Sequence, residues 1–211
     1  MNRVLHRLIG KFCAVYLDDI IIYSVTFQDH CNHVQQVFDR LKEAGLKIKP
    51  EKCTFVVNEV SYLGHIVGSN GIKPDQKKIQ TMVNLPILRN PKEVRMALGL
   101  FSYYRRFIQD FAKIAGPLHN LTKRSTTWNW TIQHQDSFDE LKFKMTTAPV
   151  LIQPDLSKAF IIQTDASDEG LGVVLAQRDD QGLEHPIAYA SRKLSDLELK
   201  YTTIEKECLA V

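Results

Sequence analysis

The chain has 211 residues, of which 44% are hydrophobic and 24% are charged, enough for one large or two small domains with apolar cores. No run of 18 apolar residues occurs, and the basic N-terminus is not followed by a signal-type apolar stretch, so we expect a soluble, intracellular protein without a membrane segment. The scattered cysteines contain no Cys-x-x-Cys pair, which favours reduced thiols over a disulfide framework: Cys13, Cys31, Cys53 and Cys208.

Charge is distributed unevenly along the chain, although the formal net charge is only +3. Residues 1–125 carry 19 Lys and Arg against 10 Asp and Glu, a balance of +9, whereas residues 126–211 carry 8 against 14, a balance of −6. The basic part predicts a polyanionic partner such as a nucleic acid backbone. The acidic part is compatible with carboxylate chemistry and equally with a solvated surface.

The segment Met1–Lys11 reads as the end of a helix, and the stretch that follows it, FCAVYLDDIIIYS, predicts a strand hairpin. Its apolar runs, Phe12–Leu17 and Ile20–Tyr23, have strand length and flank the adjacent acids Asp18 and Asp19. Two like charges beside apolar strands are costly to desolvate unless a cation joins them, and Mg²⁺ is commonly held by carboxylates. The tip is therefore a candidate metal site, although aspartate is also an ordinary turn residue.

An amphipathic helix is predicted after the hairpin, because Thr26 can cap it and apolar residues step by three and four positions up to Gly45. It contains three potential zinc ligands whose spacing on one helix does not suit a metal site, so core or solvated roles are favoured: His30, Cys31 and His33. Three strands and a turn are predicted next, at Leu46–Lys49, Cys53–Val57, Val60–Val67 and Gly68–Gly71.

The residues around the acid pair resemble a known family. Tyr16-Leu17-Asp18-Asp19 is similar to the Tyr-x-Asp-Asp box of reverse transcriptases, and FCAVYLDDIIIYS is close to that box in gypsy-type LTR retrotransposons. The resemblance implies that Asp18 and Asp19 are catalytic metal ligands and that Tyr16 contacts nucleic acid. Tyr62-Leu63-Gly64-His65 resembles the family's primer-grip hairpin, which would hold the 3′ end of the growing strand, although a glycine in a strand can mark only a bulge.

From Asp75 onward the pattern is helical. Asp75 is expected to cap a helix over Gln76–Asn84, and Asn90 a second helix. Tyr103-Tyr104-Arg105-Arg106 then combines aromatic rings with cations, which is typical of a nucleic-acid-binding groove and equally of a helix face with solvated arginines. The string LGLFSYYRRFIQDFAKIAGPLHNLTK is similar to the thumb-to-RNase H connection of gypsy-type polyproteins.

The last part of the chain predicts the opening of an RNase H fold, in which three antiparallel strands precede a helix that starts near Leu199. The strands are expected at Ala159–Gln163, Leu171–Gln177 and His185–Ser191. Asp165 follows the first strand, where an acid is either a cap or a ligand. Cleavage of a phosphodiester with two Mg²⁺ ions needs carboxylates from separate elements, so a second acid is expected on the helix.

Helical periodicity leaves Glu205 and Glu207 equivalent as that second acid. The stripe expected to face inward consists of Tyr201, Ile204, Cys208 and Val211. The family resemblance implies Glu207, because family members place the catalytic glutamate directly before a Leu-Ala type run.

Together these patterns predict a mixed α/β (α+β) fold in three parts. The resemblance implies the C-terminal part of a ferredoxin-like polymerase palm over residues 1–72, a helical thumb and connection over residues 73–125, and the N-terminal part of an RNase H-like domain over residues 126–211. The last boundary is placed in the polar stretch Lys123–Thr127.

The implied function is that of a fragment of a retrotransposon RNA-directed DNA polymerase joined to RNase H, with Mg²⁺ or Mn²⁺ as the metal. In the parent enzyme the partners would be an RNA template, a DNA primer, an RNA–DNA hybrid and a dNTP, in the cytoplasm or in a virus-like particle. We expect further palm and RNase H acids outside this sequence, so this chain alone is expected to have little activity. The alternatives are a non-catalytic nucleic-acid-binding remnant and an unstable fragment.

Overall fold

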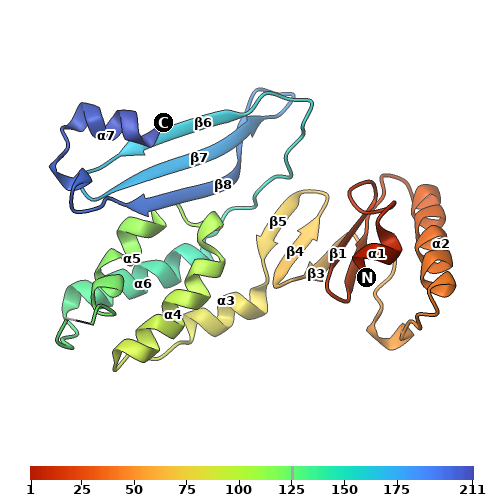
Figure 1. The fold of residues 1–211 in the computed structure, drawn as a ribbon, viewed down its shortest axis with the longest axis horizontal. Helices are drawn as coiled ribbons and strands as arrows, with labels where there is room; N and C mark the ends of the chain where they lie inside the picture. The colour runs from red at the N-terminus through yellow and green to blue at the C-terminus, as the bar shows by residue number, and fades with distance from the viewer. Residues whose placement is uncertain (125) are drawn as a thin grey trace. The chain divides into compact units, whose positions relative to one another are not determined.

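The computed structural model describes residues 1–124 and 126–211 and shows a mixed α/β protein with two compact units, Met1–Leu63 and Gly64–Val211 (Figure 1). The boundary expected in Lys123–Thr127 includes Ser125, which lies outside the described residues. The three-part division at residues 72 and 125 therefore stays a prediction. Among the described helices, none combines the length and the apolar character needed to cross a membrane.

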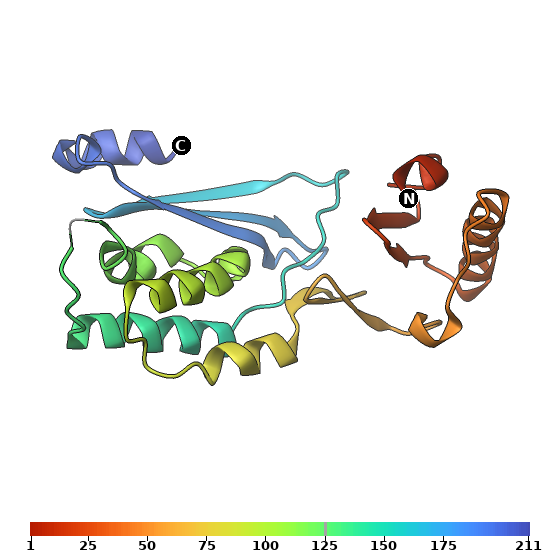
Figure 2. The same cartoon turned by 60° about the horizontal axis from the view of Figure 1, so that its bottom comes forward.

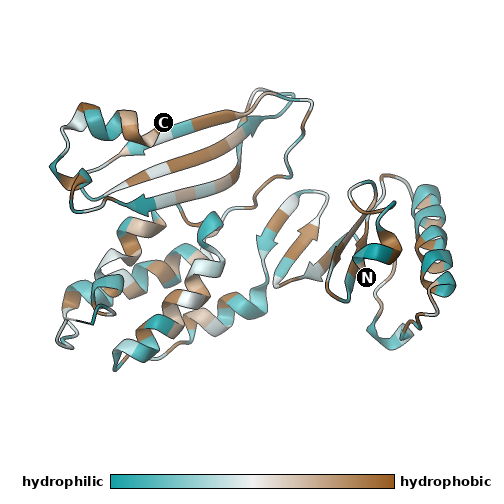
Figure 3. Ribbon diagram, viewed as in Figure 1, coloured by the Kyte–Doolittle hydropathy of each residue, from teal (hydrophilic) through white to brown (hydrophobic). Residues whose placement is uncertain are grey.

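The first unit is built from a short helix, a hairpin and a long helix. Helix α1 (Asn2–Leu5) precedes the antiparallel strands β1 (Cys13–Tyr16) and β2 (Asp19–Ile22), and α2 (Phe27–Glu43) follows them. The cap expected at Thr26 is confirmed, because its hydroxyl oxygen accepts a hydrogen bond from the Asp29 amide at 3.1 Å. The α2 helix is largely hydrophilic in Figure 3 and contributes a narrow apolar stripe to a small core of Leu5, Cys13, Val37 and Leu41.

Two of the strands predicted in this unit are wrong. Leu46–Lys49 has no strand conformation and runs into the 3-10 helix η1 (Pro50–Lys52), and Cys53–Val57 is also irregular. Val56 has a φ of 53°, a left-handed conformation that a β-branched residue rarely adopts and that is incompatible with a regular strand. Neither the alternating pattern of Leu46–Lys49 nor the apolar, β-branched composition of Cys53–Val57 was therefore sufficient to predict a strand.

The predicted strand Val60–Val67 is interrupted in its middle. It consists of β3 (Glu59–Tyr62) and β4 (His65–Gly68). The two residues between them, Leu63 and Gly64, both have positive φ, 50° and 75°, as a tight two-residue turn requires. The sequence that resembles a primer-grip hairpin thus contains a real chain reversal.

The second unit begins with a hairpin and continues with four helices. Strand β4 pairs antiparallel with β5 (Gly71–Pro74). The helices that follow are α3 (Gln76–Val83), α4 (Pro91–Tyr103), α5 (Phe111–Asn120) and α6 (Ile132–Thr146), with the 3-10 helix η2 (Arg105–Phe107) between α4 and α5. The two expected caps are confirmed: Asp75 accepts from the Lys77 amide, and Asn90 from the Lys92 and Glu93 amides. The helices enclose the main core around Phe101, Phe107 and Phe138.

A three-stranded antiparallel sheet covers these helices. Its strands lie in the order β6 (Ile161–Ala166), β7 (Gly170–Arg178) and β8 (Glu184–Lys193), as predicted for an RNase H opening. Figure 2 shows α4 to α6 on one side of this sheet and α7 (Thr203–Ala210) on the other. Strand β6 extends to Ala166, so Asp165 lies within the strand and not after it.

The start and the buried face of α7 both differ from the sequence prediction. A 3-10 helix, η3 (Glu198–Lys200), precedes α7, which begins at Thr203 because Thr202 caps it. The stripe predicted to face inward is exposed, with Ile204 77% and Val211 99% accessible. Lys206 and Ala210 are buried instead, with exposed fractions of 6% and 8%. Ala210 packs with Leu171 and Leu194 in a small apolar core.

Candidate functional site

The two acids of the first unit lie at the tip of the β1–β2 hairpin. Tyr16 pairs with Asp19 in the register, so the turn consists of Leu17 and Asp18. Leu17 has a φ of 54° and is 75% exposed, a left-handed conformation that costs free energy in a non-glycine residue and that often occurs at functional sites. Both acids are exposed and accessible to a cation from solvent, and Tyr16 is 55% exposed.

Tyr62 lies against this hairpin within the first unit. Its hydroxyl makes a long contact of 3.5 Å with the backbone oxygen of Asp19. Burial, and then the negative charge of Asp19, raise the pKa of the Tyr62 phenol above its ordinary value. The structure therefore brings one residue of the predicted primer grip next to the acid pair.

The turn glycine is held by the end of α4 within the second unit. The Tyr104 hydroxyl donates a hydrogen bond of 2.8 Å to the Gly64 carbonyl oxygen, which also accepts one from the Asp75 amide at 3.0 Å. A side chain on Gly64 would approach the Tyr104 hydroxyl to 2.9 Å, in addition to straining the positive φ. Burial is the main cause that raises the pKa of Tyr104 to about 12.

His65 packs into the same aromatic cluster. Its ring stacks on Tyr103, with centroids 5.4 Å apart and planes at 12°, and meets Tyr104 edge-on. Burial, helped by the charge of Arg106, lowers the pKa of His65, which favours the neutral imidazole. Its Nδ1 atom is buried without a hydrogen-bond partner among the described residues. Two motifs that are 40 residues apart in sequence thus form one cluster.

The remaining residues of the aromatic and basic motif differ in accessibility. Tyr103 is 55% exposed and Arg105 is exposed, whereas Tyr104 is only 4% exposed. A direct stacking role for Tyr104, as the sequence led us to expect, would require the ring to leave its core position. Arg106 is exposed but also donates to the carbonyl oxygen of Ile187 on β8, at 3.3 Å.

The acids of the last part lie on two elements that pack together. Asp165 is exposed on β6, where it pairs with Gly172, and α7 contacts β6. Glu205 accepts hydrogen bonds from the amide and the hydroxyl of Thr202, at 2.8 and 2.9 Å, which lower the pKa of its carboxyl. Glu207 is exposed and makes no side-chain hydrogen bond or ion pair with the described residues.

Sequence reasoning missed two features of this region. The capping box of Thr202 and Glu205 follows the Thr-x-x-Glu signature, which identifies Glu205 as a capping residue from the sequence alone. The buried Lys206, whose Nζ lies 3.0 Å from Asp168, had no such signal, because a lysine at that position reads as solvent-facing.

The donor chemistry of both acid pairs fits a divalent metal only in part. Carboxylate oxygens suit a hard cation such as Mg²⁺ or Mn²⁺, and the exposed pair Asp18 and Asp19 is adjacent in sequence and accessible. In the part of the chain that the structure describes, however, no three His, Cys, Asp or Glu side chains gather closely enough to hold a metal ion. Each pair would need further ligands from substrate phosphates, water or other chain segments.

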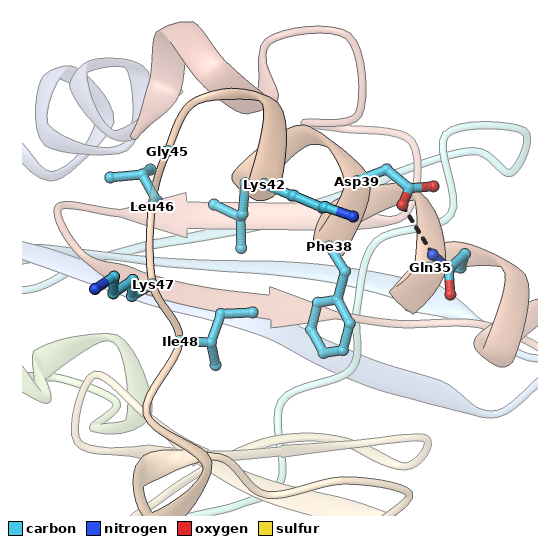
Figure 4. A pocket seen from close by; sticks show the side chains of 9 residues that line it. Gln35, Phe38, Asp39, Lys42, Gly45, Leu46, Lys47 and Ile48 are labelled. Atoms are coloured by element: carbon cyan, nitrogen blue, oxygen red, sulfur yellow. Dashed lines mark hydrogen bonds between the residues drawn. The ribbon is translucent and has the colours of Figure 1, made fainter.

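The cavity drawn in Figure 4 is lined by residues of the first unit and by none of these acids. It has a volume of about 470 Å³ and opens between α2 and the irregular segment 46–48. Within it Gln35 donates a hydrogen bond of 2.8 Å to Asp39. Its lining combines apolar and charged side chains and includes none of the predicted site residues.

Comparison with known families identifies both parts of the chain. Residues 1–67 match the family described as reverse transcriptase (RNA-dependent DNA polymerase), and residues 130–211 match the RNase H-like domain found in reverse transcriptase. The retrovirus-related Pol polyproteins from transposons 297 and opus of Drosophila melanogaster are 44% and 41% identical over the whole chain. The Tf2-3 polyprotein of Schizosaccharomyces pombe is 34% identical over the whole chain.

Solved structures show the same similarity. Foamy viral protease-reverse transcriptase dRH in complex with double-stranded DNA has a TM-score of 0.88 and 28% identity, and covers 99% of this chain. The same viral protein in complex with an RNA/DNA hybrid has a TM-score of 0.84 and 28% identity. This chain spans 36% and 28% of those two chains, and 20%, 22% and 16% of the 297, opus and Tf2-3 polyproteins.

The chain therefore belongs to the class of reverse transcriptases that carry an RNase H-like domain. More particularly, it corresponds to part of a retrotransposon Pol polyprotein of the gypsy type, as its sequence motifs led us to expect.

Proposed function

We propose that this chain supplies part of the polymerase centre and part of the RNase H centre of a retrotransposon Pol enzyme. In the first centre Asp18 and Asp19 would hold Mg²⁺ or Mn²⁺, and in the second Asp165 and Glu207 would do so. The observation that carries the proposal is the exposed acid pair at the tip of a hairpin that lies inside the reverse transcriptase match.

The metal ions would neutralise phosphate charge and stabilise the attacking and leaving oxygens of an in-line displacement. The protein's own contribution is to present the carboxylates and to place the primer end. Tyr62, Leu63, Gly64 and His65 would hold that end, with Tyr104 fixing the turn through the Gly64 carbonyl oxygen. Tyr16 at the hairpin tip and the exposed residues Tyr103, Arg105 and Arg106 would contact the nucleic acid strands.

Nucleic acid is the proposed partner for both parts of the chain. The solved neighbours are complexes with double-stranded DNA and with an RNA/DNA hybrid, and residues 1–125 of this chain carry a balance of +9. A surplus of this size supports binding through phosphates, which weakens as salt rises. RNA template, DNA primer and hybrid are the proposed ligands here, and a dNTP joins them in the longer parent enzyme.

We infer that this chain binds primer–template without extending it. Nucleotidyl transfer needs two metal ions, a template and an aligned primer end, and the described residues bring only two acids to the polymerase hairpin. Primer extension in Mg²⁺ and gel shift with a salt titration test this together. Salt-sensitive binding without synthesis is expected, and extension that Asp18→Asn abolishes would contradict the inference.

The same two assays address the alternative of a remnant that only binds nucleic acid. Adding back the remaining segments of a parent Pol enzyme should restore extension if Asp18 and Asp19 are functional ligands. Restored extension that is lost in Asp18→Asn supports the polymerase role, whereas a complemented enzyme indifferent to that substitution supports the remnant.

A further inference from the structure

The open end of the β1–β2 hairpin is attached to α2 mainly through His33, whose side chain contacts residues beside both strands. Phe12 directly precedes β1, and its ring stacks on the His33 imidazole with centroids 3.8 Å apart and planes at 3°. Ser24 lies two residues after β2, and its hydroxyl oxygen is 2.7 Å from His33 Nδ1. Both ends of the hairpin therefore meet on the same ring.

Neighbouring contacts reinforce this attachment. The Tyr23 amide donates a hydrogen bond of 3.0 Å to the Phe12 carbonyl oxygen, which closes the ladder at its open end. His30 Nδ1 lies 3.3 Å from the same Ser24 hydroxyl. The α2 helix is itself anchored in the core of the first unit, because Val37, one turn beyond His33, is 1% exposed.

The attachment has a consequence for the acids at the other end of the hairpin. A two-stranded hairpin is marginally stable by itself, and a slip of one residue would turn every side chain to the opposite face. Sliding of β1 against β2 would move Phe12 relative to Ser24, and one of the two His33 contacts would break. The register that pairs Tyr16 with Asp19 is thereby tied to a residue on α2.

We propose that His33 is a positioning residue that holds the β1–β2 hairpin in register, so that Asp18 and Asp19 can share one divalent cation. Its ring fixes the start of β1 through Phe12, and its Nδ1 fixes the end of β2 through Ser24. The assignment of a cation to the acid pair rests on the proposed function, whereas the attachment of the hairpin stands on the contacts alone.

Substitutions in the full chain separate the two contacts. His33→Phe keeps an aromatic ring for Phe12 but loses the hydrogen bond, His33→Asn keeps a polar group near the Nδ1 position but loses the ring, and His33→Ala loses both. His6→Ala, at an exposed histidine of the same unit, is the matched control. The readouts are amide hydrogen exchange of Tyr23, followed by NMR, and Mn²⁺ affinity, followed by EPR.

His33→Ala should exchange the Tyr23 amide about tenfold faster and bind Mn²⁺ several-fold more weakly, with His33→Phe and His33→Asn in between and His6→Ala unchanged. Unchanged Tyr23 exchange in His33→Ala would overturn the attachment, and faster exchange with unchanged Mn²⁺ affinity would overturn the positioning role. If the amide of the core residue Val37 also exchanges faster in His33→Ala, the milder variants Ser24→Ala and His33→Phe take its place in both measurements. Wild-type protein that binds no Mn²⁺ would contradict the proposed function, whereas the amide exchange rate of Tyr23 would still test the attachment of the hairpin to α2.

Discussion

At the scale of single residues, the Tyr104 hydroxyl makes a contact whose contribution can be measured. It donates to the Gly64 carbonyl oxygen from a side chain that is 4% exposed. Tyr104→Phe should lower the free energy of unfolding by about 1 kcal/mol, the usual value for one hydrogen bond, because Gly64 keeps its second donor, the Asp75 amide. Denaturant unfolding measures this, and Tyr201→Phe, at a tyrosine 42% exposed, should leave stability unchanged.

The same hydroxyl predicts a pH dependence. The pKa of Tyr104 is raised to about 12 in the folded state, chiefly by burial, against an ordinary value of 10. Because the folded state favours the protonated phenol, this stability is fully present below pH 10 and is lost between about pH 10 and 12. The loss should be smaller in Tyr104→Phe than in the wild type. Equal alkaline destabilisation of both proteins would show that the phenol of Tyr104 is not responsible.

The two glutamates of α7 should have separable roles. Glu205 completes the capping box with Thr202, and these hydrogen bonds lower the pKa of the Glu205 carboxyl. The stabilisation by Glu205 should therefore be present above the ordinary pKa of a glutamate and be lost as the pH falls. Glu205→Ala should lower the thermal midpoint, whereas Glu207→Ala should keep the midpoint and weaken Mn²⁺ binding. Reversed results, measured by thermal unfolding and EPR, would assign the metal role to Glu205.

At the scale of elements, α7 is anchored by a lysine. The Lys206 side chain is 7% exposed, while that of its partner Asp168 is 97% exposed. Packing of the aliphatic stem should therefore matter more than the ion pair. Lys206→Ala should destabilise the protein by about 2 kcal/mol through three lost methylene groups, and Lys206→Met by less than about 1 kcal/mol. Equal losses in both variants would show that the charge is the main anchor.

Elements with local signals could be predicted from the sequence. The caps at Thr26, Asp75 and Asn90 were correct because side chain and amide lie within a few residues of each other. The strands predicted over 46–49 and 53–57 failed because a strand needs a partner, and composition does not show whether one is present. The prediction of the buried face of α7 was wrong because packing against β6 and β7, and not helical periodicity, selects that face.

The candidate sites could likewise be predicted only where their residues are close together in the sequence. The Asp18–Asp19 hairpin could be located from its sequence, because acids between two apolar runs form a local pattern. The cluster of Gly64, His65 and Tyr104 could not, because its members come from motifs 40 residues apart that only the fold brings together. Tyr104 was accordingly expected to contact nucleic acid, whereas its burial gives it a supporting place behind the turn.

At the scale of the whole molecule, the chain combines two carboxylate pairs with a basic first part and an acidic second part. Both pairs are exposed, and each is expected to bind a divalent ion weakly until nucleic acid supplies further oxygen ligands. The proposed metal ligands of the chain are the acids of these two pairs, Asp18 with Asp19 and Asp165 with Glu207.

Paramagnetic broadening by Mn²⁺ tests this assignment of the metal ligands. In NMR spectra of the full chain, titrated with Mn²⁺ in the presence of a primer–template duplex, the amides around Asp18 and Asp19 and those around Asp165 and Glu207 should broaden first. Asp18→Asn with Asp19→Asn should abolish the first effect and leave the second. Broadening that begins elsewhere, or that persists at the hairpin in the double variant, would show that these acids are not the metal ligands.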